Sequence, residues 1–283
     1  MTDSLTDRRA VRDLLAAAKV RPSKRLGQNF LVEPRVLTEI ETAIVREAPE
    51  TIVEIGPGLG VVTEILLRHA KRVIAIEVDR RLASLLGNRF RDAEKLSIIR
   101  DDVLRVDVAS EIGAGAAYVV GNLPYRITAP ILKWLIGHRD AFSGALLLTQ
   151  REVAGKIEAS PGKDGSALGV FVRAYAETES LCQVRRGCFY PVPEVDSTLW
   201  QLEFREQPRF QANEACFFKV VRTLYGTRRK MVRRALQGIL SKDDIERVLK
   251  IARIDGTRRG EELSFEALDR LAGVLGLETD AQC

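Results

Sequence analysis

The chain has 283 residues, with 44 Lys and Arg against 39 Asp and Glu, and so a formal net charge of +5. Hydrophobic residues make up 46% and charged residues 29%, which excludes a disordered chain, a collagen-like fibre and a coiled-coil rod. No apolar run approaches the ~20 residues that span a bilayer, so we expect no membrane helix. The length predicts one large domain, or a large domain with a smaller one.

The N-terminus and the cysteines favour the cytoplasm. Residues 1–9 carry charges with no apolar core behind them, so they do not form a secretory signal. The four cysteines show neither the Cys-x-x-Cys spacing of a zinc site nor a dense disulfide framework. We therefore predict reduced thiols, no bound metal and a cytoplasmic location.

The chain opens on a basic segment. Residues 1–25 hold seven Lys and Arg against three Asp and Glu. Such a segment is typical either of a solvated helix or of an arm that binds nucleic acid.

From about residue 33 to 204, short apolar runs alternate with longer segments of helical period, such as residues 61–70. This alternation predicts βαβ units and a mainly parallel sheet. Continuous apolar runs indicate strands that are covered on both faces. The predicted strands are Thr51–Ile55, Arg72–Ile76, Leu96–Ile99, Ala117–Val120 and Ala145–Leu148.

The alternation stops before the C-terminal part. Residues 181–185 and 197–204 are strand-like with no helix between them, which predicts an antiparallel pair at the edge of the sheet. After residue 208 the pattern is helical, and Ser264 is a candidate helix start. We predict a main domain over 1–206 and a small helical domain over 207–283. The predicted helices of this second domain are 213–226, 228–239, 242–252 and 264–275.

A glycine-rich turn follows the strand Thr51–Ile55. Gly56, Gly58 and Gly60 allow a tight turn and let a ligand approach the backbone. The third glycine comes one residue earlier than in dinucleotide-binding turns, and this spacing is typical of S-adenosylmethionine sites. Glu77 follows the next strand, where a carboxylate can accept hydrogen bonds from both ribose hydroxyls. The competing interpretation is a strand-to-helix turn with a surface Glu.

Asp102 follows the third predicted strand. Ligands of open α/β sheets bind beyond the carboxyl ends of the strands, so this carboxylate can accept a hydrogen bond from the amine of a bound adenine. The alternative is that it only caps a helix.

The tetrapeptide Asn122-Leu-Pro-Tyr125 resembles a motif of methyltransferases that act on exocyclic amines of bases. Such an amine is a poor nucleophile because its lone pair is delocalised into the ring. The Asn122 side-chain carbonyl and the Leu123 backbone carbonyl can accept its two N–H groups and direct the lone pair at the methyl donor. Pro124 fixes the backbone of this turn. Tyr125 offers a ring face for stacking.

The Pro-rich loop 189–197 joins the last two predicted strands. Phe189 in this loop is predicted to clamp the opposite face of a flipped-out base. A packed turn is the alternative.

Four segments, 24–31, 54–60, 122–125 and 189–197, together resemble the ribosomal RNA adenine dimethyltransferase family over nearly the whole chain. The resemblance implies a Rossmann-like, seven-stranded α/β methyltransferase domain of class I with a reversed last strand, followed by a small all-helical domain. It also implies an S-adenosylmethionine site. That site comprises Asn29, Leu31, Gly56, Glu77, Asp102 and Asn122, of which Asn29 and Leu31 rest on the resemblance alone.

The helical tail is basic. From Ala215 to Ser241 it carries seven Lys and Arg and no acidic residue. A solvated helix face would explain such a run, but beside a base-modifying domain we predict contact with RNA phosphates. The predicted RNA-binding residues are Arg228, Arg229, Lys230, Arg233 and Arg234.

The resemblance implies transfer of methyl groups from S-adenosylmethionine to N6 of two adjacent adenosines in the 3'-terminal hairpin of 16S rRNA. The implied substrate is an immature small ribosomal subunit, and the enzyme is predicted to be a monomer. Three alternatives stay open. They are a 23S rRNA adenine methyltransferase that confers resistance, a non-catalytic nucleic-acid-binding relative, and a nicotinamide oxidoreductase, which the glycine spacing disfavours.

Overall fold

A computed structural model describes residues 5–23, 25–159, 165–227 and 229–278. The chain divides into two compact units. The first comprises Met1–Ala154 and Thr178–Phe204, and the second comprises Gly155–Glu177 and Arg205–Cys283. The segment Gly155–Glu177 therefore groups with the C-terminal helices, although the sequence pattern assigned it to the main domain. The functional division at residues 206 and 207 stays a proposal.

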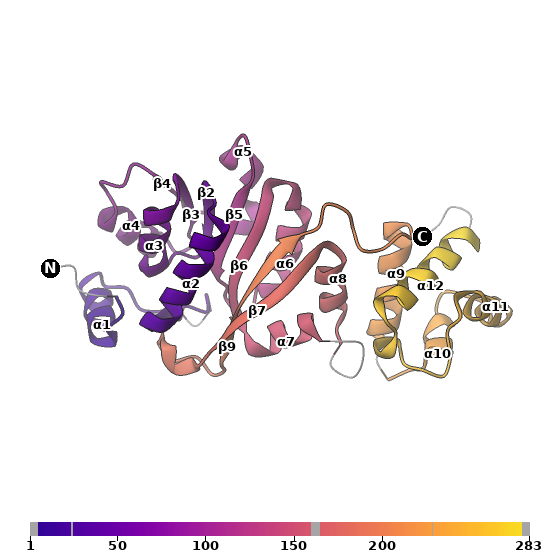
Figure 1. The fold of residues 1–283 in the computed structure, drawn as a ribbon. Coiled ribbons are helices and arrows are strands. Elements are labelled where there is room, and N and C mark those ends of the chain that lie inside the picture. Colours follow the sequence, from indigo (N-terminus) through magenta and orange to yellow (C-terminus); the bar gives the residue numbers. More distant parts are fainter. Residues whose placement is uncertain (1–4, 24, 160–164, 228, 279–283) are drawn as a thin grey trace. The chain divides into compact units, whose positions relative to one another are not determined.

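A seven-stranded sheet forms the centre of the first unit, in the order β4-β3-β2-β5-β6-β9-β7 (Figure 1). Neighbours from β4 to β6 pair in parallel, whereas β9 is antiparallel to β6. This topology confirms the predicted α/β fold with a reversed last strand. The strands are β2 (Thr51–Ile55), β3 (Arg72–Ile76), β4 (Leu96–Ile99), β5 (Ala117–Asn122), β6 (Phe142–Gln150), β7 (Ala176–Val184) and β9 (Ser197–Phe204).

Helices cover both sides of the sheet in Figure 1. On one face, Ile44 and Leu66 pack in a buried cluster with Tyr118, and all three side chains are at most 2% exposed. The central strands β2, β3 and β5 are buried on both faces, which explains their continuous apolar runs. The helices of this region are α2 (Pro34–Glu47), α3 (Val61–His69), α4 (Arg80–Arg89), α5 (Val108–Ile112), α6 (Thr128–Gly137) and α7 (Arg151–Glu158).

The N-terminal segment is a helix, α1 (Arg8–Ala17), that begins at the cap Asp7. It is not simply solvated, because Val11 and Leu15 are buried in a cluster with Phe30 and Leu59. After it, β1 (Phe30–Leu31) pairs with β8 (Phe189–Tyr190) in a separate two-stranded sheet. The N-terminal segment thereby packs against the glycine-rich turn through Leu59.

The second unit is helical and holds an aromatic cluster. The rings of Phe210 and Phe217 stack with their centroids 4.6 Å apart, and Phe218 contacts both. Ser264 accepts a hydrogen bond from the Ala267 N–H, which confirms it as a helix start. The helices are α8 (Ala167–Tyr175), α9 (Glu214–Gly226), α10 (Val232–Leu236), α11 (Lys242–Ala252) and α12 (Phe265–Glu278).

The predicted helix 228–239 is wrong over much of its length, because α10 covers only Val232–Leu236. The preceding backbone pairs elsewhere: Met231 forms a bridge with Arg259, and the Val232 N–H donates to the Arg258 carbonyl at 2.7 Å. These hydrogen bonds compete with those of a helix. Arg229 and Lys230 therefore lie outside the helix that carries Arg233 and do not share a helical face with it.

Cys182 and Cys188 are free, in line with the expected reduced thiols at these two positions. Within the described ranges, no helix is long and apolar enough to cross a membrane.

Candidate functional site

A cavity of about 250 Å³ lies beyond the carboxyl ends of the parallel strands. In an open α/β sheet this edge is the usual place for a ligand. The segment that precedes β1 and the turns after β2, β3, β4 and β5 all contribute to the lining. Of the predicted cofactor residues, it includes Asn29, Leu31, Gly56, Gly58, Glu77, Asp102 and Asn122.

The glycine turn between β2 and α3 has the backbone conformation that the sequence predicted. Gly56, Gly58 and Gly60 all have positive φ, at 68°, 59° and 83°. A Cβ at Gly58 would lie 3.1 Å from the Phe30 ring, so the turn packs closely. Gly60 differs, because a Cβ there would lie 2.6 Å from Phe90 and the residue does not line the cavity. Gly60 therefore packs against Phe90, and its place in the cofactor site stays a prediction.

Glu77 is held at the end of β3 with 4% of its surface exposed. Its carboxylate accepts hydrogen bonds from the N–H groups of Asp79 at 2.9 Å and Gly58 at 3.2 Å. Burial raises the pKa of Glu77, and these two hydrogen bonds oppose that rise. Each carboxylate oxygen has a further acceptor site, which two ribose hydroxyls can use.

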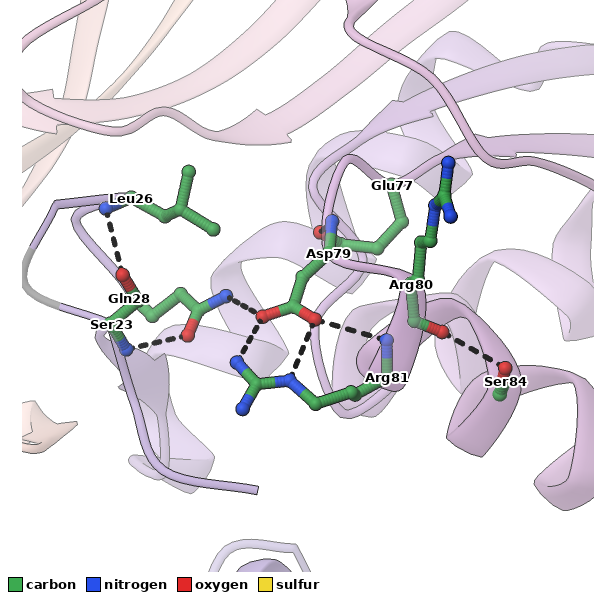
Figure 2. A network of polar contacts seen from close by, with 8 residues as sticks. All are labelled: Ser23, Leu26, Gln28, Glu77, Asp79, Arg80, Arg81 and Ser84. Atoms are coloured by element: carbon green, nitrogen blue, oxygen red, sulfur yellow. Dashed lines mark hydrogen bonds and ion pairs between the residues drawn. The ribbon is translucent and has the colours of Figure 1, made fainter. Parts of the chain in front are cut away.

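A polar network ties the segment before β1 to this carboxylate (Figure 2). Gln28 accepts from the Ser23 N–H at 2.7 Å and donates to Asp79 at 3.1 Å. Asp79 also accepts from the Arg81 guanidinium, which lowers the pKa of Asp79 to about 2. The Asp79 N–H in turn donates to Glu77. The sequence did not reveal this role of Gln28, because its partner lies 51 residues away.

Asp102 both caps a helix and lines the cavity. Its side chain accepts from the Leu104 N–H at 3.1 Å, at the start of a short 3-10 helix. The two alternatives from the sequence are therefore compatible. Val78 and Val103, which directly follow Glu77 and Asp102, also line the cavity and give it apolar walls. Because these two valines directly follow the two acids in the sequence, they could have been predicted as cavity residues.

Asn122 ends β5 with its amide in a fixed orientation. The Nδ2 group donates to the backbone carbonyl of Asn29 at 2.9 Å. The Asn29 side chain in turn donates to the Gly27 carbonyl at 3.1 Å. Within the described residues the Oδ1 atom of Asn122 accepts no hydrogen bond, so it is available to a ligand.

Leu123 offers a second acceptor. Its side chain is buried and its N–H donates to the Leu148 carbonyl at 2.9 Å. In the described part of the chain its own carbonyl accepts no hydrogen bond. Pro124 lines the cavity and lies against Gly27, where a Cβ would be 3.2 Å from the Pro124 Cβ. Gly27 has φ +63°, so glycine permits this approach.

Tyr125 is held by the end of the loop 189–197. Its hydroxyl lies 3.0 Å from that of Ser197, which is 1% exposed. Burial raises the pKa of Tyr125, so the phenol stays neutral. The ring does not line the cavity as the structure stands. Its stacking role stays a prediction.

Phe189 is not placed as a clamp. Its side chain is 1% exposed and belongs to the buried cluster that contains Leu37 and Ile44. Its backbone pairs with Leu31 in the small sheet, so the ring points into the core. Loop position alone did not reveal this pairing. In this structure Phe189 is part of a packed turn, which was the alternative interpretation.

Glu54 is buried at the base of the cavity. Burial raises the pKa of Glu54 to about 8, although the Thr63 hydroxyl lies 2.6 Å from its carboxyl. Below its ordinary pKa of 4.5 both folded and unfolded chains carry the proton. As the pH rises from there to about 8, only the unfolded chain ionises, so the folded state loses stability.

We therefore expect Glu54→Gln to gain stability relative to the wild type as pH rises through this window. The gain should reach at most about 1.4 kcal/mol per pH unit and then level off. Thermal unfolding of both proteins between pH 4.5 and about 8 measures this difference in stability. Parallel curves at every pH would show that Glu54 ionises normally in the fold.

Four of the predicted RNA-binding residues, Arg229, Lys230, Arg233 and Arg234, are exposed but not equivalent. Arg229, Lys230 and Arg234 form no side-chain hydrogen bond or ion pair with other described residues. Arg233 pairs with Glu246 at 2.9 Å. Arg228 lies outside the described residues. No group of three or more side chains in the described ranges is arranged to hold a metal ion.

The sequence pattern of the family described as "Ribosomal RNA adenine dimethylase" matches residues 20–273. Among similar curated proteins are two called Ribosomal RNA small subunit methyltransferase A. The one from Clostridioides difficile is 34% identical and aligns over 99% of this chain and 100% of its own. The one from Anoxybacillus flavithermus is 40% identical and aligns over 86% of each chain.

Two solved structures share the fold over most of the chain. A dimethyladenosine transferase from Plasmodium falciparum has a TM-score of 0.74 at 24% identity, over 86% of this chain and 95% of its own. The 23S rRNA methyltransferase ErmE has a TM-score of 0.68 at 25% identity, over 87% of this chain and 99% of its own.

Proposed function

The chain belongs to the ribosomal RNA adenine dimethylase family and is an S-adenosylmethionine-dependent rRNA adenine dimethyltransferase, and on that premise we propose its target. The proposed target is N6 of two adjacent adenosines in the 3'-terminal hairpin of 16S rRNA. We further propose that the enzyme acts as a monomer in the cytoplasm on an immature small subunit during ribosome assembly. The names of the similar proteins from Clostridioides difficile and Anoxybacillus flavithermus support the small subunit.

The groups that line the cavity match the hydrogen-bonding groups of the cofactor. The positive-φ turn at Gly56 and Gly58 leaves space for a ligand against the backbone, and Glu77 offers acceptor sites to a ribose. Asp102 offers an acceptor to the adenine amine. When bound, S-adenosylmethionine supplies the electrophilic methyl group.

The orientation of the Asn122 amide carries the proposal that the target atom is an exocyclic amine. Because Nδ2 is held by the Asn29 carbonyl, Oδ1 is the atom that faces a substrate. Together with the Leu123 carbonyl it provides two acceptors for an amine with two N–H groups. Accepting both hydrogens favours a pyramidal nitrogen with its lone pair toward the methyl group. The rate enhancement comes from orienting the amine and from dipoles that are fixed near it, so a strong base is not required.

Methyl transfer to ribosomal particles tests the target. Small and large subunits from cells that lack this modification are incubated with the enzyme and tritiated S-adenosylmethionine, and the labelled bases are mapped. We expect two adjacent N6-dimethyladenosines near the 3' end of 16S rRNA. Label in 23S rRNA would instead support the resistance-type alternative. Absence of label in every particle would support a non-catalytic role.

The basic tail is proposed to bind RNA phosphates through Arg229, Lys230 and Arg234. Replacing all three with Gln should flatten the log–log salt dependence of RNA binding by about two units, because each phosphate contact on a single strand contributes about 0.7. Methylation at saturating RNA should persist. Arg233→Gln serves as the control, since Arg233 already pairs with Glu246. Equal slopes for the triple variant and the wild type would leave the tail a purely structural element.

A further inference from the structure

We infer that Arg25 and Arg126 form a phosphate clamp at the cavity, which holds the RNA backbone beside the target adenosine. This inference rests on the proposed function. It concerns two residues that lie outside the motif positions assigned above to the cofactor and the amine. The clamp would make the enzyme select an adenosine within a polynucleotide chain rather than a free nucleoside.

The two arginines lie on loops that touch each other. Arg25 is two residues before Gly27, and Arg126 is two residues after Pro124. A Cβ at Gly27 would lie 3.2 Å from the Pro124 Cβ and 3.7 Å from the Tyr125 N atom. The loop that contributes to the cofactor site thus packs directly on the loop that carries the target-base motif. Both arginines line the cavity and both are exposed.

Neither arginine has a partner in the part of the chain that the structure describes. This is unlike Arg81, which is paired with Asp79, and Arg89, which is paired with Glu64. A guanidinium that is left free at a ligand site is suited to an external anion.

The charges of the residues that line the cavity favour phosphate binding at the two arginines. Among the described lining residues, Arg25 and Arg126 are the basic ones. The other ionisable lining groups are acids, namely Glu54, Glu77, Asp101 and Asp102. Glu54 keeps its proton in the folded protein up to about pH 8, but the carboxylates of Asp101 and Asp102 repel a polyanion, so attraction for a backbone phosphate is concentrated at the arginines. A guanidinium also matches two phosphate oxygens at once, which fixes the backbone in orientation as well as position.

The test compares Arg25→Gln, Arg126→Gln and the double variant with Arg91→Gln, an exposed arginine that does not line the cavity. The RNA is whichever species the wild type methylates, so a wrong 16S assignment would not affect the comparison. RNA affinity is measured over a range of salt, together with KM and kcat for RNA. Cofactor affinity is measured by calorimetry.

We expect the double variant to raise KM for RNA at least about tenfold and to flatten the salt slope by about 1.4, which corresponds to two single-strand phosphate contacts. The kcat at saturating RNA and the cofactor affinity should stay within about twofold. Values that match Arg91→Gln would overturn the clamp. An equal loss of cofactor affinity would also overturn it, because it would assign the arginines to the carboxylate of the cofactor.

Discussion

Turnover should fall by at least about 100-fold when Asn122 is replaced with alanine, whereas cofactor affinity should change by less than about tenfold. The variant loses the Oδ1 acceptor that aligns the amine, and this alignment matters most in the transition state. The hydrogen bond from Nδ2 to the Asn29 carbonyl is lost as well, so a small effect on the cofactor loop is expected. Single-turnover methylation at saturating RNA and calorimetry with the cofactor measure the two effects.

Asn88→Ala is the matched control for this prediction. Asn88 is an exposed residue of α4 that does not line the cavity. The control should methylate at the wild-type rate and bind cofactor normally. If Asn122→Ala also methylates at a near wild-type rate, the two-acceptor alignment of the amine is wrong.

Glu77→Ala is expected to weaken cofactor binding by about 100-fold or more. Two hydrogen bonds from ribose hydroxyls to a carboxylate are lost, each worth about 1.5–3 kcal/mol, and 1.4 kcal/mol corresponds to a factor of ten. Glu77 also accepts from two backbone N–H groups, so thermal unfolding must show that the variant is folded. Calorimetric titration with S-adenosylmethionine gives the affinity.

Two further variants separate the ribose contact from general effects of the substitution. Glu77→Gln keeps the shape of the side chain but loses the charge, so its affinity should lie between those of the wild type and Glu77→Ala. Glu94→Ala removes an exposed acid outside the cavity and should bind normally. Unchanged affinity in Glu77→Ala would reject the ribose role.

The strands were the most predictable part of the fold. β2, β3, β4 and β9 begin and end at the predicted residues. For β2 and β3 the reason is burial on both faces, which produces runs of apolar residues that turns interrupt. The helix α10 was not predictable in the same way. Its first residues donate their backbone hydrogen bonds to the loop near Arg258, and such long-range pairing leaves no trace in local periodicity.

Gly56, Glu77 and Asn122 were predictable from their own motifs, and all three line the cavity. Their roles in binding and catalysis stay predictions. The contacts between distant segments that fix these side chains were not predictable. The hydrogen bond from Asn122 to Asn29 spans 93 residues.

The same limit explains Phe189, whose place in a Pro-rich loop suggested an available ring. The pairing of its backbone with Leu31 turns the side chain into the core.

The most direct test of the alignment account is a crystal structure of the protein with S-adenosylhomocysteine and a bound adenosine. We expect the N6 amine to lie within about 3 Å of both the Asn122 Oδ1 atom and the Leu123 carbonyl oxygen, on the side from which the methyl group departs. An adenosine whose N6 points away from Asn122, or whose amine contacts neither acceptor, would contradict it.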